Sequence, residues 1–283
     1  MLTVPGNHDL TRPTGDAEHH LKEVMRTYFL QAQQRGRFWQ DAQCEMRCMV
    51  DRSFNSYSRW QAANLDFQKA EGKIFPAMFA KGVLPGDFSC FMEKRGYRVG
   101  IVGLNTAFMA MSGEILEDPI VIDPSQVWNC LSYRASEQFG SNDVNLLLTH
   151  HPALLSSSSS SLDVSDDIDL SHFFAAHMCG HLHDAAYSET HLQPGSRLIR
   201  IQTPSLFSNV THRAAANVAS ERLHGYTVIE LQIDDDTASM RWLPRVITKD
   251  RRWVPDSARF TLSRDGWATM PVDLKQRRTQ MLR

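Results

Sequence analysis

The sequence lacks any long apolar run, and its first residues lack the pattern of a secretory signal. No stretch approaches the roughly 18 apolar residues that a membrane helix requires, so we expect no membrane anchor. The opening Met-Leu-Thr-Val-Pro-Gly has no basic segment followed by an apolar core, so we expect no signal peptide either. These absences predict a cytoplasmic protein.

The chain also has little excess of either charge and no regular cysteine spacing. Its 30 basic and 32 acidic residues give a formal net charge of -2, which does not favour nucleic acid as an obligatory partner. A local basic patch is compatible with this net charge. We expect nucleic acid only as a substrate. The five cysteines are odd in number and form no C-x-x-C pair. We therefore predict reduced thiols and no disulfide framework.

The 283 residues, 42% of them hydrophobic, suffice for one large domain or for one domain with an appendage. Hydrophobic periodicity predicts helices and strands that alternate over the first two thirds, and mainly strands afterwards. The expected fold is an α/β sandwich with mixed sheets. The expected helices are 17–40, 54–70, 125–139 and 171–176, and the expected strands are 2–4, 98–104, 144–149, 177–179, 198–202, 226–233 and 239–243.

Two segments are expected to be irregular, and a change of composition further along the chain marks a domain boundary. Leu84-Pro85-Gly86-Asp87 is typical of a turn, and the six consecutive serines at 156–161 indicate a mobile loop. The chain is basic and poorly periodic from Arg245 onward. We therefore predict a domain over 1–244 and a C-terminal extension or linker over 245–283.

Three polar clusters each follow an expected strand: Gly6-Asn7-His8-Asp9, Thr149-His150-His151-Pro152 and Gly180-His181-Leu182-His183. Side chains at the carboxyl ends of strands in open α/β sheets converge on one crevice. Glycine lets the backbone turn sharply there. Imidazole nitrogens and an amide oxygen suit Mn, Fe, Zn or Co better than Ca or Mg. The pattern predicts a transition-metal site.

In order and approximate spacing, these clusters resemble the third, fourth and fifth motifs of the calcineurin-like metallophosphoesterases: G-N-H-D/E, a strand-terminal H (often H-H-P) and G-H-x-H. The resemblance covers roughly residues 2–243 and implies that family's α/β/β/α sandwich of two mixed sheets. It implies a metal-dependent phosphoester hydrolase, acting on a monoester or diester, in which water activated between two cations attacks phosphorus in line. The segments 84–89 and 100–108 also resemble bacterial members linked to NTPase domains, which suggests a fused or neighbouring NTPase as a partner.

Carried over by position, the resemblance assigns roles to individual residues. Asn7, His150 and His181 would ligate one metal ion, and His183 would ligate the other. His8 would assist the leaving group, with Asp9 as the motif's acidic residue beside it.

Several of these side chains have a simpler structural interpretation. Asp9 could orient His8, or it could only cap the loop. Arg12 could bind a substrate phosphate through its guanidinium, although an exposed salt bridge is the commoner role. His151 is expected to support the site or the fold rather than to be a ligand. Asp184 could orient His183, and Asn105 could face the site, but a solvent-facing carboxylate and a turn asparagine are the commoner readings.

The family's first two motifs, D-x-H and G-D-x-x-D, do not occur in the sequence. They would supply an aspartate and a histidine to one ion and the aspartate that bridges both. We therefore expect an N-terminally incomplete domain that is inactive by itself and holds at most one ion weakly. The alternative is a non-catalytic module of a multidomain protein that binds phosphate or one metal ion and regulates its neighbour.

Overall fold

The computed structural model describes most of the chain, in two compact units, residues 1–174 and 175–283. The described residues are 1–12, 16, 20, 32–70, 78–111, 121–131, 140–152, 154–155, 173–182, 185–193, 196–206, 224–234, 236–248, 250–272 and 274. Among them, no helix is both long and apolar enough to cross a membrane. The five cysteines are free thiols, as predicted.

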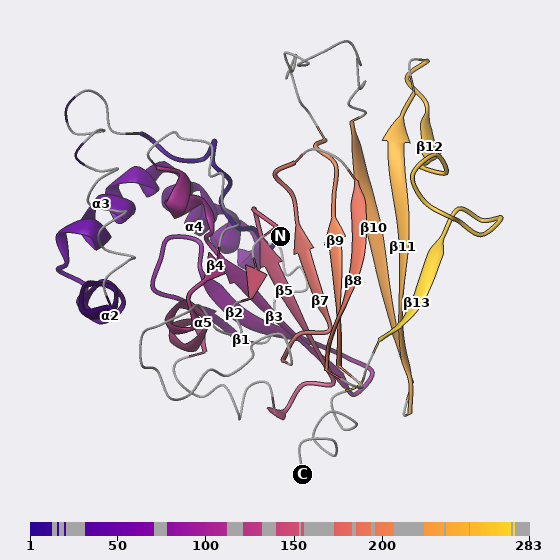
Figure 1. The fold of residues 1–283 in the computed structure, drawn as a ribbon, viewed down its shortest axis with the longest axis horizontal. Helices are drawn as coiled ribbons and strands as arrows, with labels where there is room; N and C mark the ends of the chain where they lie inside the picture. The colour runs from indigo at the N-terminus through magenta and orange to yellow at the C-terminus, as the bar shows by residue number, and fades with distance from the viewer. Residues whose placement is uncertain are drawn as a thin grey trace. The chain divides into compact units, whose positions relative to one another are not determined.

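The first unit contains a mixed sheet in the order β1-β2-β3-β5 (Figure 1). β1 (Met78–Lys81), β2 (Phe88–Lys94) and β3 (Tyr97–Leu104) are antiparallel neighbours. β5 (Val144–Thr149) pairs in parallel with β3, so the carboxyl ends of these two strands lie at the same sheet edge. A separate parallel pair joins β4 (Val121–Ile122) to β6 (Leu154–Leu155).

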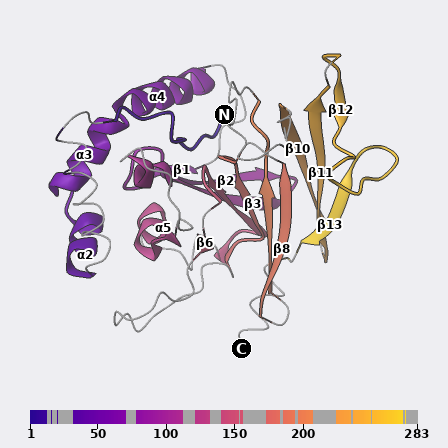
Figure 2. The ribbon, with the colours of Figure 1, turned by 45° about the horizontal axis from the view of Figure 1, so that its top comes forward.

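Three helices follow one another in an arc in this unit: α2 (Ala32–Gln40), α3 (Glu45–Ser53) and α4 (Asn55–Ala70) (Figure 2). Their apolar faces form one core with the 3-10 helix η1 (Ala107–Ala110), which follows β3. Phe38 and Trp39 of α2 contact Phe108 of η1, with ring centroids 5.9 and 6.2 Å away. A shorter helix is α5 (Pro124–Cys130). Asp123 caps its N-terminus, and the Asp123 side chain accepts a hydrogen bond from Ser125 N.

The second unit has a mixed three-stranded part and a separate antiparallel sheet. β7 (Ala176–Cys179) is parallel to β9 (Ser196–Gln202), which is antiparallel to β8 (Ala186–Gln193). In the other sheet, the long strand β11 (Ala238–Ile247) pairs with β10 (Gly225–Ile233), β12 (Trp253–Pro255) and β13 (Ala268–Val272). β11 alternates buried and partly exposed residues, and buried Trp242 stacks on Tyr187 of β8 at 5.0 Å.

The structure therefore has the α/β class with mixed sheets that the sequence predicts, together with an antiparallel sheet. The strands expected at 98–104, 144–149, 177–179, 198–202 and 226–233 are present, and the one expected at 239–243 extends over Ala238–Ile247. Of the helices expected at 17–40 and 125–139, the structure describes Ala32–Gln40 and Pro124–Cys130. The serine run 156–161 lies outside the described residues.

Two expected elements are wrong. Residues 2–4 are not in a strand, because α4 satisfies their backbone: the Thr3 carbonyl accepts hydrogen bonds from Tyr57 Oη at 2.9 Å and Gln61 Nε2 at 3.3 Å. Residues 174–176 are not helical, since β7 already begins at Ala176. Helix α3 was not expected, because its polar and charged residues obscure the apolar stripe of Met46 and Val50.

Candidate metal centre

Two of the predicted ligands meet in the first unit although 143 residues separate them. Asn7 Oδ1 lies 3.1 Å from His150 Nε2. His150 directly follows β5, whereas Asn7 lies in the turn after Pro5 and Gly6. Since an amide oxygen only accepts hydrogen bonds, Nε2 of His150 carries the proton in this contact. The donor atoms of the third and fourth motifs thus face one another.

Close contact between Gly6 and His150 makes this meeting possible. A Cβ atom at Gly6 would lie 2.9 Å from both Cε1 and Nδ1 of the imidazole. Real Cβ contacts are essentially never that short, so any side chain at this position would displace the ring. The glycine of the motif is therefore required by the approach of the imidazole to the backbone.

The loop that carries Asn7 is held by its own side chains. Asp9 Oδ2 accepts a hydrogen bond from Gly6 N at 2.8 Å, and Asp9 N donates to Gly6 O at 3.0 Å. Arg12 Nη2 donates to the carbonyl of Asn7 at 2.7 Å. Asp9 thus holds the loop, and the described contact of Arg12 is with the backbone rather than in a salt bridge. His8 is exposed beside Asn7, where solvent or a ligand can reach its ring.

His151 is buried and makes contacts different from those of His150. Its Nδ1 lies 3.0 Å from Thr106 Oγ1, which also accepts a hydrogen bond from the His151 backbone N–H at 3.1 Å. Thr149 Oγ1 donates to the His151 carbonyl at 2.6 Å. The two histidine rings are nearly perpendicular, with centroids 4.8 Å apart. His151 therefore ties the end of β5 to Thr106, at the end of β3, as expected of a supporting residue.

Asp87 forms a buried polar network that the sequence did not reveal. Its Oδ1 accepts hydrogen bonds from Asn105 N at 2.7 Å and Gln126 Nε2 at 2.9 Å, and its Oδ2 accepts one from Leu84 N at 3.1 Å. Burial raises the pKa of the carboxyl from 3.8 to about 7, even though these bonds and Arg47 favour the charged form. The only sequence signal was the turn motif, which does not report burial.

This network sets the turn that packs against the Asn7 loop. Asn105 Nδ2 donates to the Pro85 carbonyl at 2.9 Å, so this side chain holds the turn, which is the commoner role expected for it. Gly86 has a φ of +88°, and a Cβ atom there would lie 2.5 Å from Cδ of Pro5. The Asp87 network and the Asn7 loop are thus joined through the contact between Gly86 and Pro5.

The fifth motif lies in the second unit. His181 follows β7 and has a φ of +70°, a left-handed conformation that residues other than glycine rarely adopt. Leu182 N donates to the Gly180 carbonyl at 2.9 Å, which closes the turn. Strain of this kind is typical of functional loops. His183 and Asp184 lie outside the described residues.

The comparisons with known proteins do not assign a family. No protein-family model matches the sequence, and no curated protein matches it.

The donor set itself shows what the centre can bind. In the first unit, an amide oxygen and imidazole nitrogens face one another, and the donor nitrogens of His150 and His151 lie within 4.8 Å. Neutral oxygen and nitrogen donors fit a borderline transition-metal ion. A bound ion would take the place of the Nε2 proton of His150, since a ligating imidazole nitrogen must be deprotonated.

Proposed function

We propose that the chain belongs to a metal-dependent phosphoester hydrolase of the metallophosphoesterase type. The observation that carries the proposal is the 3.1 Å approach of Asn7 Oδ1 to His150 Nε2 across 143 residues. Two motifs chosen for metal-binding chemistry contribute donor atoms to one place, and Gly6 has no room for a side chain there. A turn with an unrelated surface histidine would not require this arrangement.

In this proposal, Asn7, His150 and His181 hold one divalent ion, and His183 contributes to a second. The resemblance assigns His181 to the first ion, and His151 orients the end of β5 through Thr106. The ions would be Mn, Fe, Zn or Co. When bound, a pair of such ions activates water and neutralises charge on the phosphoryl oxygens.

The chain's own residues have separate roles toward a phosphoester. His8 is exposed next to Asn7, so its ring can give a proton to the departing alcohol oxygen. Arg12 holds the Asn7 carbonyl through Nη2 at 2.7 Å, and its guanidinium has further N–H groups that can bind a phosphate oxygen. Asp9 keeps the loop closed through Gly6 N, which fixes the positions of His8 and Asn7.

Metal titration of the 283-residue chain tests the first part of this proposal. We expect about one Mn²⁺ or Zn²⁺ to bind by calorimetry and elemental analysis. Asn7→Ala and His150→Ala should each weaken binding by roughly 10- to 100-fold or more. Matched controls are Asn64→Ala, at a partly buried position in α4, and His20→Ala, at an exposed position. Equal metal binding in all four variants would refute the assignment of Asn7 and His150.

Hydrolysis assays separate the enzyme from the regulatory alternative. The chain contains neither D-x-H nor G-D-x-x-D, and its described donors toward the ion are neutral. We therefore expect no turnover of p-nitrophenyl mono- or diesters by this chain with Mn²⁺. A version extended through any upstream in-frame segment that carries those motifs should be active, and His8→Ala should lower its turnover by roughly 10²- to 10⁴-fold with little change in metal content. An inactive extended enzyme would favour the non-catalytic module.

A further inference from the structure

The outer face of the β10–β11–β12 sheet carries an exposed aromatic pair that the proposed hydrolase does not use. Tyr226 of β10 is 39% exposed and Trp253 of β12 is 38% exposed. Their ring centroids lie 4.9 Å apart with an interplanar angle of 60°. β10 and β12 both pair with β11, so the two rings meet across the central strand. The pair forms a small exposed aromatic surface that a flat ligand group could stack on.

Arginines surround this pair. Arg245 of β11 is the cross-strand partner of Tyr226, and its Nη2 donates to the Trp253 carbonyl at 2.7 Å. That acceptor is neutral, so the bond positions the guanidinium without compensating its charge. Arg251 and Arg252 are exposed in the turn that connects β11 to β12. Arg252 forms an ion pair with Asp250, but both side chains are more than 70% exposed, and such pairs are weak.

The turn between β11 and β12 holds Arg251 in an uncommon backbone conformation. Arg251 has a φ of +59°, and its N–H donates to the Thr248 carbonyl at 2.9 Å, closing the turn. This left-handed conformation favours glycine, so an arginine is a strained choice. Arg95, in the turn between β2 and β3, has a similar φ of +56°, so the conformation is not specific to this surface. What Arg251 contributes to the surface is an exposed positive charge.

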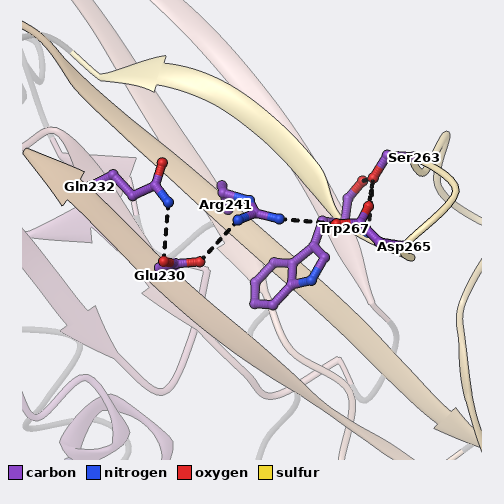
Figure 3. Close-up of polar contacts among 6 residues, drawn as sticks. All are labelled: Glu230, Gln232, Arg241, Ser263, Asp265 and Trp267. Atoms are coloured by element: carbon purple, nitrogen blue, oxygen red, sulfur yellow. Dashed lines mark hydrogen bonds and ion pairs between the residues drawn. The ribbon is translucent and has the colours of Figure 1, made fainter.

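The other end of the same face has a different character. There Arg241 is already neutralised, since it pairs with Glu230 at 3.3 Å and Asp265 at 3.2 Å while its guanidinium lies over the Trp267 ring at 4.7 Å (Figure 3). Beyond it, the β10–β11 connection carries Asp234 and Asp236. At the end with Tyr226 and Trp253, by contrast, three arginines and one exposed aspartate lie beside the rings.

We propose that this patch, consisting of Tyr226, Arg245, Arg251, Arg252 and Trp253, binds single-stranded nucleic acid. Exposed aromatic rings stack on bases of any sequence, and nearby arginines bind the phosphates that connect them. A sheet that presents aromatic side chains beside basic ones is a common arrangement for this purpose. A nucleic-acid strand uses both features of the patch, since its bases can stack on the two rings and each of its phosphates carries a negative charge that an arginine can bind. The proposal does not depend on the hydrolase activity.

Fluorescence anisotropy with a labelled oligo(dT) of about 12 nucleotides tests this surface, since one such binding site covers roughly 4–16 nucleotides. The full chain should bind the single strand, with weaker binding to a blunt duplex of equal length and with affinity that falls steeply with salt. Trp253→Ala and Tyr226→Ala should each weaken binding by roughly 5- to 100-fold. The matched control is Trp60→Ala, which removes another exposed tryptophan, 46% exposed and beside Tyr57, and should leave binding unchanged.

Arg251→Gly separates binding from folding. Glycine relieves the left-handed strain, so the melting temperature should rise, while the slope of log affinity against log salt should fall by about 0.7 as one phosphate contact is lost. Stability and affinity then move in opposite directions, which a folding defect cannot produce. No binding at low salt, equal binding of duplex and single strand, or unchanged affinity in Trp253→Ala and Tyr226→Ala would overturn the proposal. Self-association that Trp253→Ala abolishes would assign the surface to a second copy instead.

Discussion

The buried carboxyl of Asp87 gives the sharpest prediction on pH. Loss of hydration raises its pKa from 3.8 to about 7, so the folded protein binds this proton more tightly than the unfolded chain does. Protonation therefore stabilises the fold. The contribution of Asp87 to the free energy of unfolding is largest below pH 3.8 and falls as pH rises, until it levels off near pH 7. With about 1.4 kcal/mol for each pH unit, the total loss is about 4 kcal/mol.

The assay compares the wild type with Asp87→Asn by urea denaturation at pH 5 and pH 8. Asparagine keeps the Oδ1 bonds from Asn105 and Gln126, but its amide NH₂ faces the Leu84 N–H in place of Oδ2. The variant should therefore be less stable at pH 5, but it lacks the titrating group. Between pH 5 and pH 8, the wild type should lose about 2.5 kcal/mol more than the variant.

The difference between the two proteins isolates Asp87 from groups with opposite effects. Burial also lowers the pKa of His177 to about 3, so stability associated with that neutral ring is lost as pH falls, not as it rises. Asp41→Asn, in the turn after α2 with a side chain that is 39% exposed, controls for the general effect of removing a carboxyl. If the wild type loses no more stability than Asp87→Asn between pH 5 and pH 8, the three hydrogen bonds outweigh desolvation, the carboxyl titrates below this range, and the reasoning is refuted.

Two glycine substitutions test the close contacts described above. Gly6→Ala would place Cβ 2.9 Å from the His150 ring, and the resulting shift of the ring should weaken metal binding by roughly 10- to 100-fold. The control is Gly36→Ala, where a Cβ atom would have nothing within 4 Å and metal binding should be unchanged. Equal metal affinities of the two variants would contradict the contact between Gly6 and His150. Gly103→Ala would place Cβ against the buried ring of Phe88 and should lower the free energy of unfolding by about 1–3 kcal/mol through overpacking. Gly36→Ala is again the control, and an unchanged urea midpoint would show that the Phe88 ring moves freely.

Local pattern predicted much of the secondary structure because the relevant information is local. The β-branched and apolar residues of Val144–Thr149 and Tyr97–Leu104 identify buried strands whatever their neighbours are. The resemblance of the polar clusters to metallophosphoesterase motifs made Asn7 and His150 candidate ligands, and this stays a prediction. It was wrong about residues 2–4, because side chains of α4 take the place of a neighbouring strand for the Thr3 carbonyl.

By itself, the sequence determined the α/β class and the residue types available for metal chemistry, since both depend on short segments. Only the tertiary structure decided that Asn7 Oδ1 lies 3.1 Å from His150 Nε2, and that the Asp87 carboxyl is fully buried among Leu84, Asn105 and Gln126. Burial and contact depend on partners far along the chain, and those partners set the pKa of a carboxyl and the space beside a glycine. The aromatic pair of Tyr226 and Trp253 has the same origin, because the pairing of β10 and β12 with β11 brings the two rings together.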